Sequence, residues 1–272
     1  MKIKIGRWVG FVYALVCVFL FLFPFYMLIV ASTYSTGEIS KSVSLMFGSY
    51  LVENFEKVLY TTDFQYYFVN SLYVAIFNVI ITVSICLMCG YGVAKYQFKL
   101  KKFFDGFIIF TLMIPTSLGM IALVWELRQM DWMNSHLPLI FTTVANSFSV
   151  FWFRQMALDV PDEVLESARI DGSNEFRTFL RIAIPMMKPA IATVALIDFN
   201  LSWNNYMLPS IVIQDSKKFT LPVGIATFAS MYLVDNSAKV LGTLLGIAPI
   251  IIIYILSSKY VINGITSGAV KG

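Results

Sequence analysis

Ionisable residues are scarce in this chain, so the places where they gather or stand alone are the candidates for chemistry. The densest gathering lies between Pro161 and Arg181, where carboxylates and basic groups alternate between two strongly apolar stretches. Such a segment is either an ordinary solvated loop or a surface whose charges pair with a partner. A single carboxylate, Asp198, interrupts the apolar stretch from Pro189 to Gln214. A carboxylate is costly to hold in apolar surroundings, so Asp198 is a second candidate for function.

The composition places most of the chain in lipid. Of its 272 residues, 58% are hydrophobic and only 13% are charged, against roughly 25% charged residues in soluble domains. A helix needs about 20 apolar residues to cross a membrane, and the charge-free runs are near or above that length. The sequence therefore predicts an all-α membrane protein whose residues 1–272 form one domain. Six transmembrane helices are expected at about 9–31, 67–94, 106–125, 137–158, 186–209 and 240–258.

The distribution of basic residues predicts the orientation. The first span follows basic residues, as a signal peptide does, but its apolar run is too long and no Ala-x-Ala cleavage site follows, so we expect a retained helix. With the N-terminus and C-terminus in the cytoplasm, fourteen of the twenty lysines and arginines lie inside, as the positive-inside rule requires. The polar segment 159–185 then faces the cytoplasm.

Local signals predict two short helices in this segment. Pro161 suits the first turn of a helix, where its missing N–H is no loss. Gly172 is placed to adopt the left-handed conformation that ends the helix, and Ser173 or Asn174 can cap the next one. A second short helix is expected over Glu175–Arg181. Two helices joined by a sharp turn would form a rigid projection.

The segment resembles the cytoplasmic coupling loop of bacterial ABC importer permeases. Ser167 and Ile184 depart from the pattern of that loop, and the residues that match it are Glu166, Ala168, Gly172, Ile182 and Pro185. In that family the loop is the surface on which a separate ATPase acts. The resemblance implies that the residues contacting the ATPase or shaping the loop for it are Glu163, Glu166, Ala168, Arg169, Asp171, Gly172 and Phe176.

Three further stretches resemble the G-type permease subunit of maltose-type carbohydrate importers. The tail Asn263–Gly272 is similar to the Gly-Leu-Thr-Ala-Gly-Ala-Val-Lys-Gly ending of those subunits, with Ser267 as a departure. Trp203–Pro209 is similar to their Trp-Asn-Glu-Phe segment, with Asn205 in place of Glu, and Val160–Glu163 is similar to the lead-in of their coupling loop. The resemblance implies the type I ABC importer permease fold in a bacterial cytoplasmic membrane, and a sugar as the solute.

The resemblance also implies partners. They are a second, non-identical permease, two copies of a cytosolic ABC ATPase, an extracytoplasmic solute-binding protein, the sugar itself and membrane lipid. ATP is then bound by the ATPase subunits, and the chain contains no G-x-x-x-x-G-K-[ST] phosphate loop. We therefore expect no enzyme activity, no catalytic residue, no cofactor and no metal site in this chain. The net charge of +4 needs no nucleic acid to explain it.

A polar face in the fifth expected span is the candidate for the translocation pathway. Helical spacing places Asp198, Ser202 and Asn205 on one face. Beside them lie two further amides and two aromatic rings, which are Asn200, Asn204, Trp203 and Tyr206. These side chains could bind the hydroxyls and C–H faces of a sugar, or they could join two permeases or line a wet cavity without touching solute.

Two other functions stay open at this point. One is an ABC importer permease for another solute, such as a polyamine or a phosphonate. The other is a secondary transporter or channel, although the internal repeats and the second buried charge typical of that class are lacking.

Overall fold

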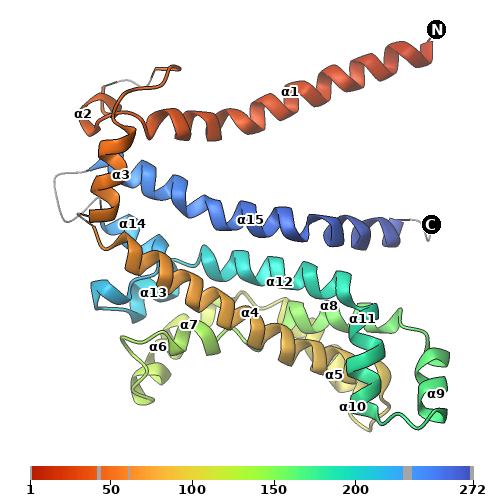
Figure 1. Cartoon of the computed structure of the whole chain (residues 1–272). Helices are drawn as coiled ribbons and strands as arrows, with labels where there is room; N and C mark the ends of the chain where they lie inside the picture. Colours follow the sequence, from red (N-terminus) through yellow and green to blue (C-terminus); the bar gives the residue numbers. More distant parts are fainter. Residues whose placement is uncertain (1, 42–43, 61, 229–234, 270–272) are drawn as a thin grey trace. The chain divides into compact units, whose positions relative to one another are not determined.

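The structure is a computed structural model that describes residues 2–41, 44–60, 62–228 and 235–269 (Figure 1). Every regular element within these ranges is a helix. The elements are α1 (Lys2–Ala31), α2 (Thr36–Ile39), α3 (Leu51–Tyr60), α4 (Phe64–Lys95), α5 (Lys101–Leu112), η1 (Thr116–Gly119), α6 (Met120–Gln129), α7 (Leu137–Phe141), α8 (Ser147–Leu158), α9 (Asp162–Ile170), α10 (Glu175–Thr178), η2 (Phe179–Ala183), α11 (Ile184–Met186), α12 (Lys188–Trp203), α13 (Met207–Val212), η3 (Ser216–Lys218), α14 (Leu221–Thr227) and α15 (Asn236–Ala269).

Long apolar helices account for part of the predicted membrane region. Three segments of α1, α4 and α15 are long and apolar enough to cross a membrane, and two bent helix pairs raise the number to five among the described residues. The pairs are α5 with the segment from Ser117 to Gln129, bent by 83°, and the helical run 175–186 with 188–212, bent by 77°. The expected span 137–158 is divided into α7 and α8. Six spans therefore stay a prediction.

Proline and asparagine explain where these helices break. Pro115 stands in extended backbone between α5 and η1, and Pro189 occupies the first turn of α12 just after the bend at Met187. The residue before a proline is disfavoured in helical geometry, which agrees with the non-helical backbone at Ile114 before Pro115. Pro189 has no N–H to donate to a preceding turn, so it is favoured in the first turn of a new helix. Between α7 and α8, the side chain of Asn146 accepts hydrogen bonds from the amides of Phe148 and Ser149 and so caps α8.

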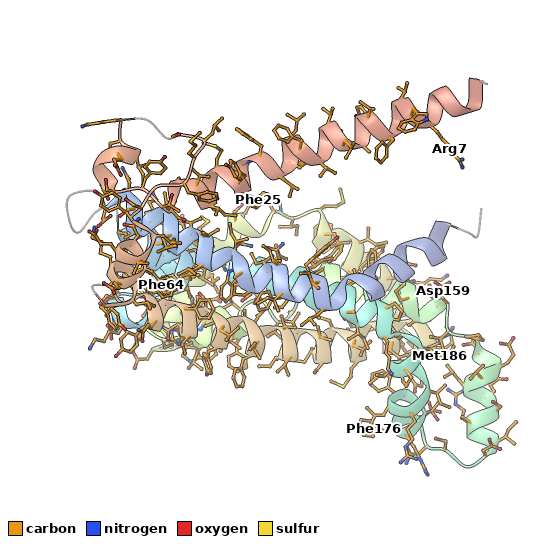
Figure 2. All side chains as sticks on the ribbon, turned by 45° about the horizontal axis from the view of Figure 1, so that its top comes forward. Arg7, Phe25, Phe64, Asp159, Phe176 and Met186 are labelled. Carbon is orange, nitrogen blue, oxygen red and sulfur yellow. The ribbon has the colours of Figure 1, made fainter. Side chains whose placement is uncertain are left out.

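The chain divides into two compact units, one formed by Met1–Gln65 with Val223–Ala248 and the other by Tyr66–Pro222 with Pro249–Gly272. In the first unit, the side chains of α1 from Arg7 to Phe25 project outward along the helix (Figure 2), and most of them are exposed apolar groups. Such a surface is suited to lipid or to another apolar helix.

The first unit also contains a tight polar cluster around Asp235. Its carboxylate accepts hydrogen bonds from the hydroxyls of Thr36 at 2.6 Å and Ser237 at 2.7 Å, and Lys57 lies 3.4 Å away. Burial alone would raise the pKa of Asp235, but these donors outweigh it and bring the pKa to about 2. The carboxylate is therefore ionised at any physiological pH and ties α2 and α3 to the start of α15.

In the second unit, α4 packs against α8 and α12 around a continuous apolar core. Buried members of this core include Cys86 on α4, Phe153 on α8 and Val194 on α12, together with Leu165 and Phe179 from the segment after α8. In Figure 1, the short helices α9, α10 and α11 lie at the end of this unit where α4 finishes, away from α6, α7 and α13.

Candidate functional site

The predicted coupling loop is a helix, a glycine turn and a second helical run. Helix α9 ends at Gly172, whose φ is +84°. The amide of Ser173 donates to the carbonyl of Ala168 at 2.9 Å, and the amide of Gly172 donates to the carbonyl of Arg169 at 3.0 Å. These two bonds define a Schellman motif, which needs a left-handed residue at the glycine position. The predicted conformation of Gly172 is confirmed.

The second helix of the loop is longer than predicted. The side chain of Asn174 caps it by accepting from the amide of Arg177 at 2.8 Å, as one of the two predicted caps. The helix does not end near Arg181, because α10 continues through a π-helical turn, η2, and then α11 as far as Met186. The helical run from Glu175 to Met186 ends at the 77° bend that precedes α12.

The outer surface of the loop carries acidic and apolar side chains. Glu163, Glu166 and Asp171 are exposed. Ile170 and Phe176 are 86% and 66% exposed, and Phe176 lies toward the tip, away from Asp159 and Met186 at the base (Figure 2). Exposed apolar side chains gathered beside charges are typical of a protein interaction surface.

Two residues that the resemblance grouped with this surface have contacts within the loop. Ala168 is buried on the face of α9 that packs inward with Leu165. Arg169 is exposed, and its guanidinium pairs with the carboxylate of Glu175, with contacts of 2.7 and 3.2 Å. The ion pair of Arg169 therefore joins the two helices of the loop at its surface.

The end of α4 holds the start of both helices in the loop. The ammonium of Lys95 donates to the carbonyl of Val160 at 2.5 Å and to the carboxylate of Asp162 at 2.7 Å. The hydroxyl of Tyr96 donates to the carboxylate of Glu175 at 2.6 Å. The loop is consequently bound to the rest of the second unit by side chains as well as by its own chain ends.

These contacts favour the ionised forms of the two carboxyl groups and the neutral form of the tyrosine. The hydrogen bonds from Arg169 and then from Tyr96 hold the pKa of the Glu175 carboxyl below its ordinary value. Lys95 likewise lowers the pKa of Asp162. Burial, together with the bond to Glu175, raises the pKa of Tyr96 to about 12, so its hydroxyl remains a donor.

Sequence reasoning missed Lys95, Tyr96 and Glu175 as site residues. Lys95 counted only toward the orientation rule, and Glu175 only as the start of a short helix. The hydrogen bonds that join Lys95 and Tyr96 to the loop span 65 to 79 residues of the chain, and no local pattern links residues at that separation.

A cavity of about 640 Å³ with a mixed polar and apolar lining lies elsewhere in the second unit. Asp198, Ser202 and Asn205 from α12 and the residues after it line one side of it, as their predicted common face requires, and Asn78 of α4 lines another. The stretch from Thr142 to Phe148 between α7 and α8 also contributes, as do residues of α5 and α6. Among the described residues that line the cavity, Asp198 is the one with a charged side chain.

Asp198 also has a structural task. Asp198 is 3% exposed. Its carboxylate accepts hydrogen bonds from the side chains of Asn146 at 3.1 Å and Ser149 at 3.2 Å. Both donors belong to the first turn of α8, where the positive end of the helix dipole stabilises a carboxylate. Asp198 therefore joins α12 to α8 as well as facing the cavity.

The other candidates for the pathway point elsewhere. Trp203 is buried and stacks on Phe199, with ring centroids 5.5 Å apart. Asn200 and Asn204 are exposed and hydrogen-bonded to each other, and Tyr206 is exposed too. These three residues do not line the cavity. Of the seven residues predicted for the pathway, three therefore line the cavity and four do not.

Metal-ligating side chains do not converge in the part of the chain that the structure describes. No group of three His, Cys, Asp or Glu residues there is placed to hold an ion.

Comparison with known proteins adds to this geometry. Residues 86–266 match the profile of the family described as "Binding-protein-dependent transport system inner membrane component". The chain is 34% identical over 262 residues to the arabinooligosaccharides transport system permease protein AraQ of Halalkalibacterium halodurans, covering 93% of this chain and 92% of that protein. It is 29% identical over 253 residues to the lactose transport system permease protein LacG of Rhizobium radiobacter, with coverages of 93% and 92%.

A solved structure has a similar fold. The chain superposes with a TM-score of 0.82 on a chain in the crystal structure of a bacterial ABC transporter involved in the import of the acidic polysaccharide alginate, at 20% identity, covering 95% of this chain and 97% of that one. The predicted all-α ABC importer permease fold is thereby confirmed. Together with the family match and the identity to AraQ, it leads to one conclusion: this chain belongs to the family of binding-protein-dependent transport system inner membrane components.

Proposed function

We propose that this chain is the permease subunit of an ATP-driven, binding-protein-dependent importer of sugars or oligosaccharides, and that all 272 residues form its transmembrane domain. The observation that carries the proposal is the coupling loop, a rigid projection whose exposed surface combines carboxylates with Ile170 and Phe176. A loop with this surface is suited to fit a cleft in a cytosolic ATPase. The sugar is supported by the names of the relatives and by the many hydroxyl and amide groups that line the cavity.

The proposed assembly contains one copy of this chain, a second, non-identical permease, two cytosolic ATPases and an extracytoplasmic solute-binding protein. Both termini and the loop 159–185 lie in the cytoplasm, which is supported by the excess of lysine and arginine on that side. ATP and the loaded binding protein must each favour the outward-open state over the inward-open state, because a ligand shifts an equilibrium only through its differential affinity.

Purification of the complex from the native membrane tests this proposal. We expect this chain to copurify with a different permease and with ATPase subunits, and we expect the binding protein to contain a sugar. Uptake in reconstituted vesicles should require ATP and that binding protein. A transport-competent homodimer of this chain, or a binding protein loaded with a polyamine or a phosphonate, would contradict the proposal.

Within this assembly, Ser202 and Asn205 are proposed to contact the sugar in transit. Replacing both with alanine should lower uptake roughly thirtyfold, since two lost hydrogen bonds of on the order of 1 kcal/mol each sum to about 2 kcal/mol. The measurement is the initial rate of labelled sugar uptake at saturating ATP. Asn200→Ala is the matched control, because Asn200 lies on the same helix outside the cavity. Equal rates in the double variant and the control would exclude the contact.

A further inference from the structure

The loop has two kinds of connection to the wall of the cavity. The first is covalent: α8, whose first turn lines the cavity, leads into α9, and α11 leads into α12 through a bend of 77° at Met187. The second is noncovalent and passes through the end of α4, which is one unbroken helix of 32 residues. Regular helices and networks of packed or hydrogen-bonded side chains are the elements that carry coupling between distant sites.

Five side chains make the second connection, and we call them the α4 clamp: Lys95, Tyr96, Asp162, Arg169 and Glu175. Lys95 is the anchor, because its side chain is only 6% exposed although it carries a charge. An ammonium in that position needs its partners, since a buried charge without them is strongly destabilising. The carbonyl of Val160 and the carboxylate of Asp162 supply them.

The clamp holds the two helices of the loop at separate points. Lys95 holds the start of α9, and Tyr96 holds the start of α10 through Glu175. Arg169 closes the arrangement by joining the end of α9 to the same carboxylate. Because the points are distinct, the loop resists rotation as well as translation relative to the end of α4.

Apolar contacts support the clamp from the inner side. The ring of Tyr91 lies 4.9 Å from that of Phe179 and 6.2 Å from that of Tyr96. Tyr91 and Phe179 share one buried cluster with Leu165 of α9. The loop and the last turns of α4 are therefore packed as one body.

Further along α4, Asn78 reaches the cavity. Its side-chain amide donates to the carbonyl of Ile140 at 2.9 Å and to the hydroxyl of Thr143, and Asn78 and Thr143 both line the cavity. The same helix thus touches the coupling loop at its end and the cavity wall in its middle.

We propose that α4 transmits displacement of the coupling loop to the cavity, and that the α4 clamp makes this connection. The inference rests on the proposed function, because it takes the loop as the place where the ATPase acts. Lys95 and Tyr96 are positioning residues in this scheme. They act through α4 and touch neither solute nor nucleotide.

The test is the number of sugar molecules imported per ATP hydrolysed, measured in vesicles that contain the whole complex with its binding protein. The variant Lys95→Met/Tyr96→Phe keeps the apolar stem and the ring but removes both donors. We expect it to lower the ratio at least fivefold while the complex assembles and hydrolyses ATP. Lys95→Arg keeps a donor and should restore most of the ratio, and Lys99→Met, in the same basic turn, is the matched control.

A second measurement probes the contact itself. Tyr96→Phe and Glu175→Ala should not be additive, because Glu175→Ala removes the acceptor of the Tyr96 hydroxyl as well as the acceptor of the Arg169 guanidinium. The double variant is expected to lower the ratio no further than Glu175→Ala does alone. Additive losses would show that the two residues act separately.

Two outcomes would overturn the inference. In the first, Lys95→Met/Tyr96→Phe imports sugar at the normal ratio. In the second, uptake and hydrolysis fall together with the yield of the complex, which is the behaviour of a contact that only stabilises the loop. Gly172→Leu in the same vesicles separates this failure from a failure of the proposed function: if that variant is also normal, the loop has no coupling role.

Discussion

Gly172→Leu is expected to reduce sugar uptake tenfold or more while the chain still enters the membrane. Gly172 adopts a φ of +84°, and the left-handed conformation costs a residue with a β-carbon about 1–2 kcal/mol. A branched side chain there would favour another turn between α9 and α10. The exposed carboxylates and apolar side chains of the loop would then no longer match the ATPase. Uptake in vesicles and the yield of the assembled complex are the two measurements.

Gly172→Asn is the matched control for this experiment. Asparagine tolerates the left-handed conformation better than other residues with a β-carbon, and no heavy atom lies within 4 Å of the position where a β-carbon would stand. We expect Gly172→Asn to retain most of the uptake. If Gly172→Leu also retains it, the geometry of the turn is irrelevant to transport.

Gly90→Ala is expected to destabilise the second unit by about 1–3 kcal/mol, the usual cost of adding a group to a well-packed core. A β-carbon at Gly90 would stand 2.8 Å from the amide nitrogen of Arg154 and 2.8 Å from the carbonyl oxygen of Val150. Both are backbone atoms of α8, so no side-chain rotation relieves the contact. The result should be a lower thermal midpoint and a lower yield of the complex in detergent.

Gly92→Ala provides the comparison for Gly90→Ala. It lies two residues away on the same helix, and no heavy atom lies within 4 Å of its β-carbon position. It should leave the midpoint unchanged or raise it slightly, because alanine favours a helix over glycine. Similar midpoints for the two variants would mean that α4 and α8 do not approach as closely as described.

Local signals were sufficient to predict the long apolar helices α1, α4 and α15 and the turn of the coupling loop. A helix in lipid must satisfy its own backbone, so apolar length alone indicates α1, α4 and α15. The turn at Gly172 and the cap at Asn174 depend on residues within a few positions of each other. Such features are determined by short stretches of chain, which is why the sequence was informative there.

The division between α7 and α8 and the contacts of α4 with the loop depend on residues far apart in the chain. The residues around Thr142 are apolar enough to suggest an uninterrupted helix. The side-chain amide of Asn78, however, donates to the carbonyl of Ile140, and Asn146 caps the next helix. The bond of Asn78 joins residues 62 positions apart and cannot be deduced from local spacing, whereas the cap at Asn146 is a local signal that sequence reasoning missed. The ion pair of Lys95 with Asp162 is a further example.

Helical spacing identifies residues that share a face but not what the face meets. The common face of Asp198, Ser202 and Asn205 was predicted correctly, and it lines the cavity. The same reasoning could not show that Trp203 turns into the core or that Ala168 faces inward on α9. Whether a side chain faces the core or the surface depends on which helices pack beside its own, and that packing is a property of the tertiary structure.

The π-helical turn at Phe179–Ala183 bears on how such a subunit could tolerate a change of length during evolution. A π turn accommodates one residue more than an α-helical turn. Deletion of a single codon there would restore α geometry, while the residues on either side, including Phe176, would keep their faces of the helix. Deletion of one residue from a regular α-helical turn would instead rotate every side chain beyond it by roughly 100° about the helix axis. The chain can therefore lose one residue at this turn without changing how the outer surface of the loop is presented to the ATPase.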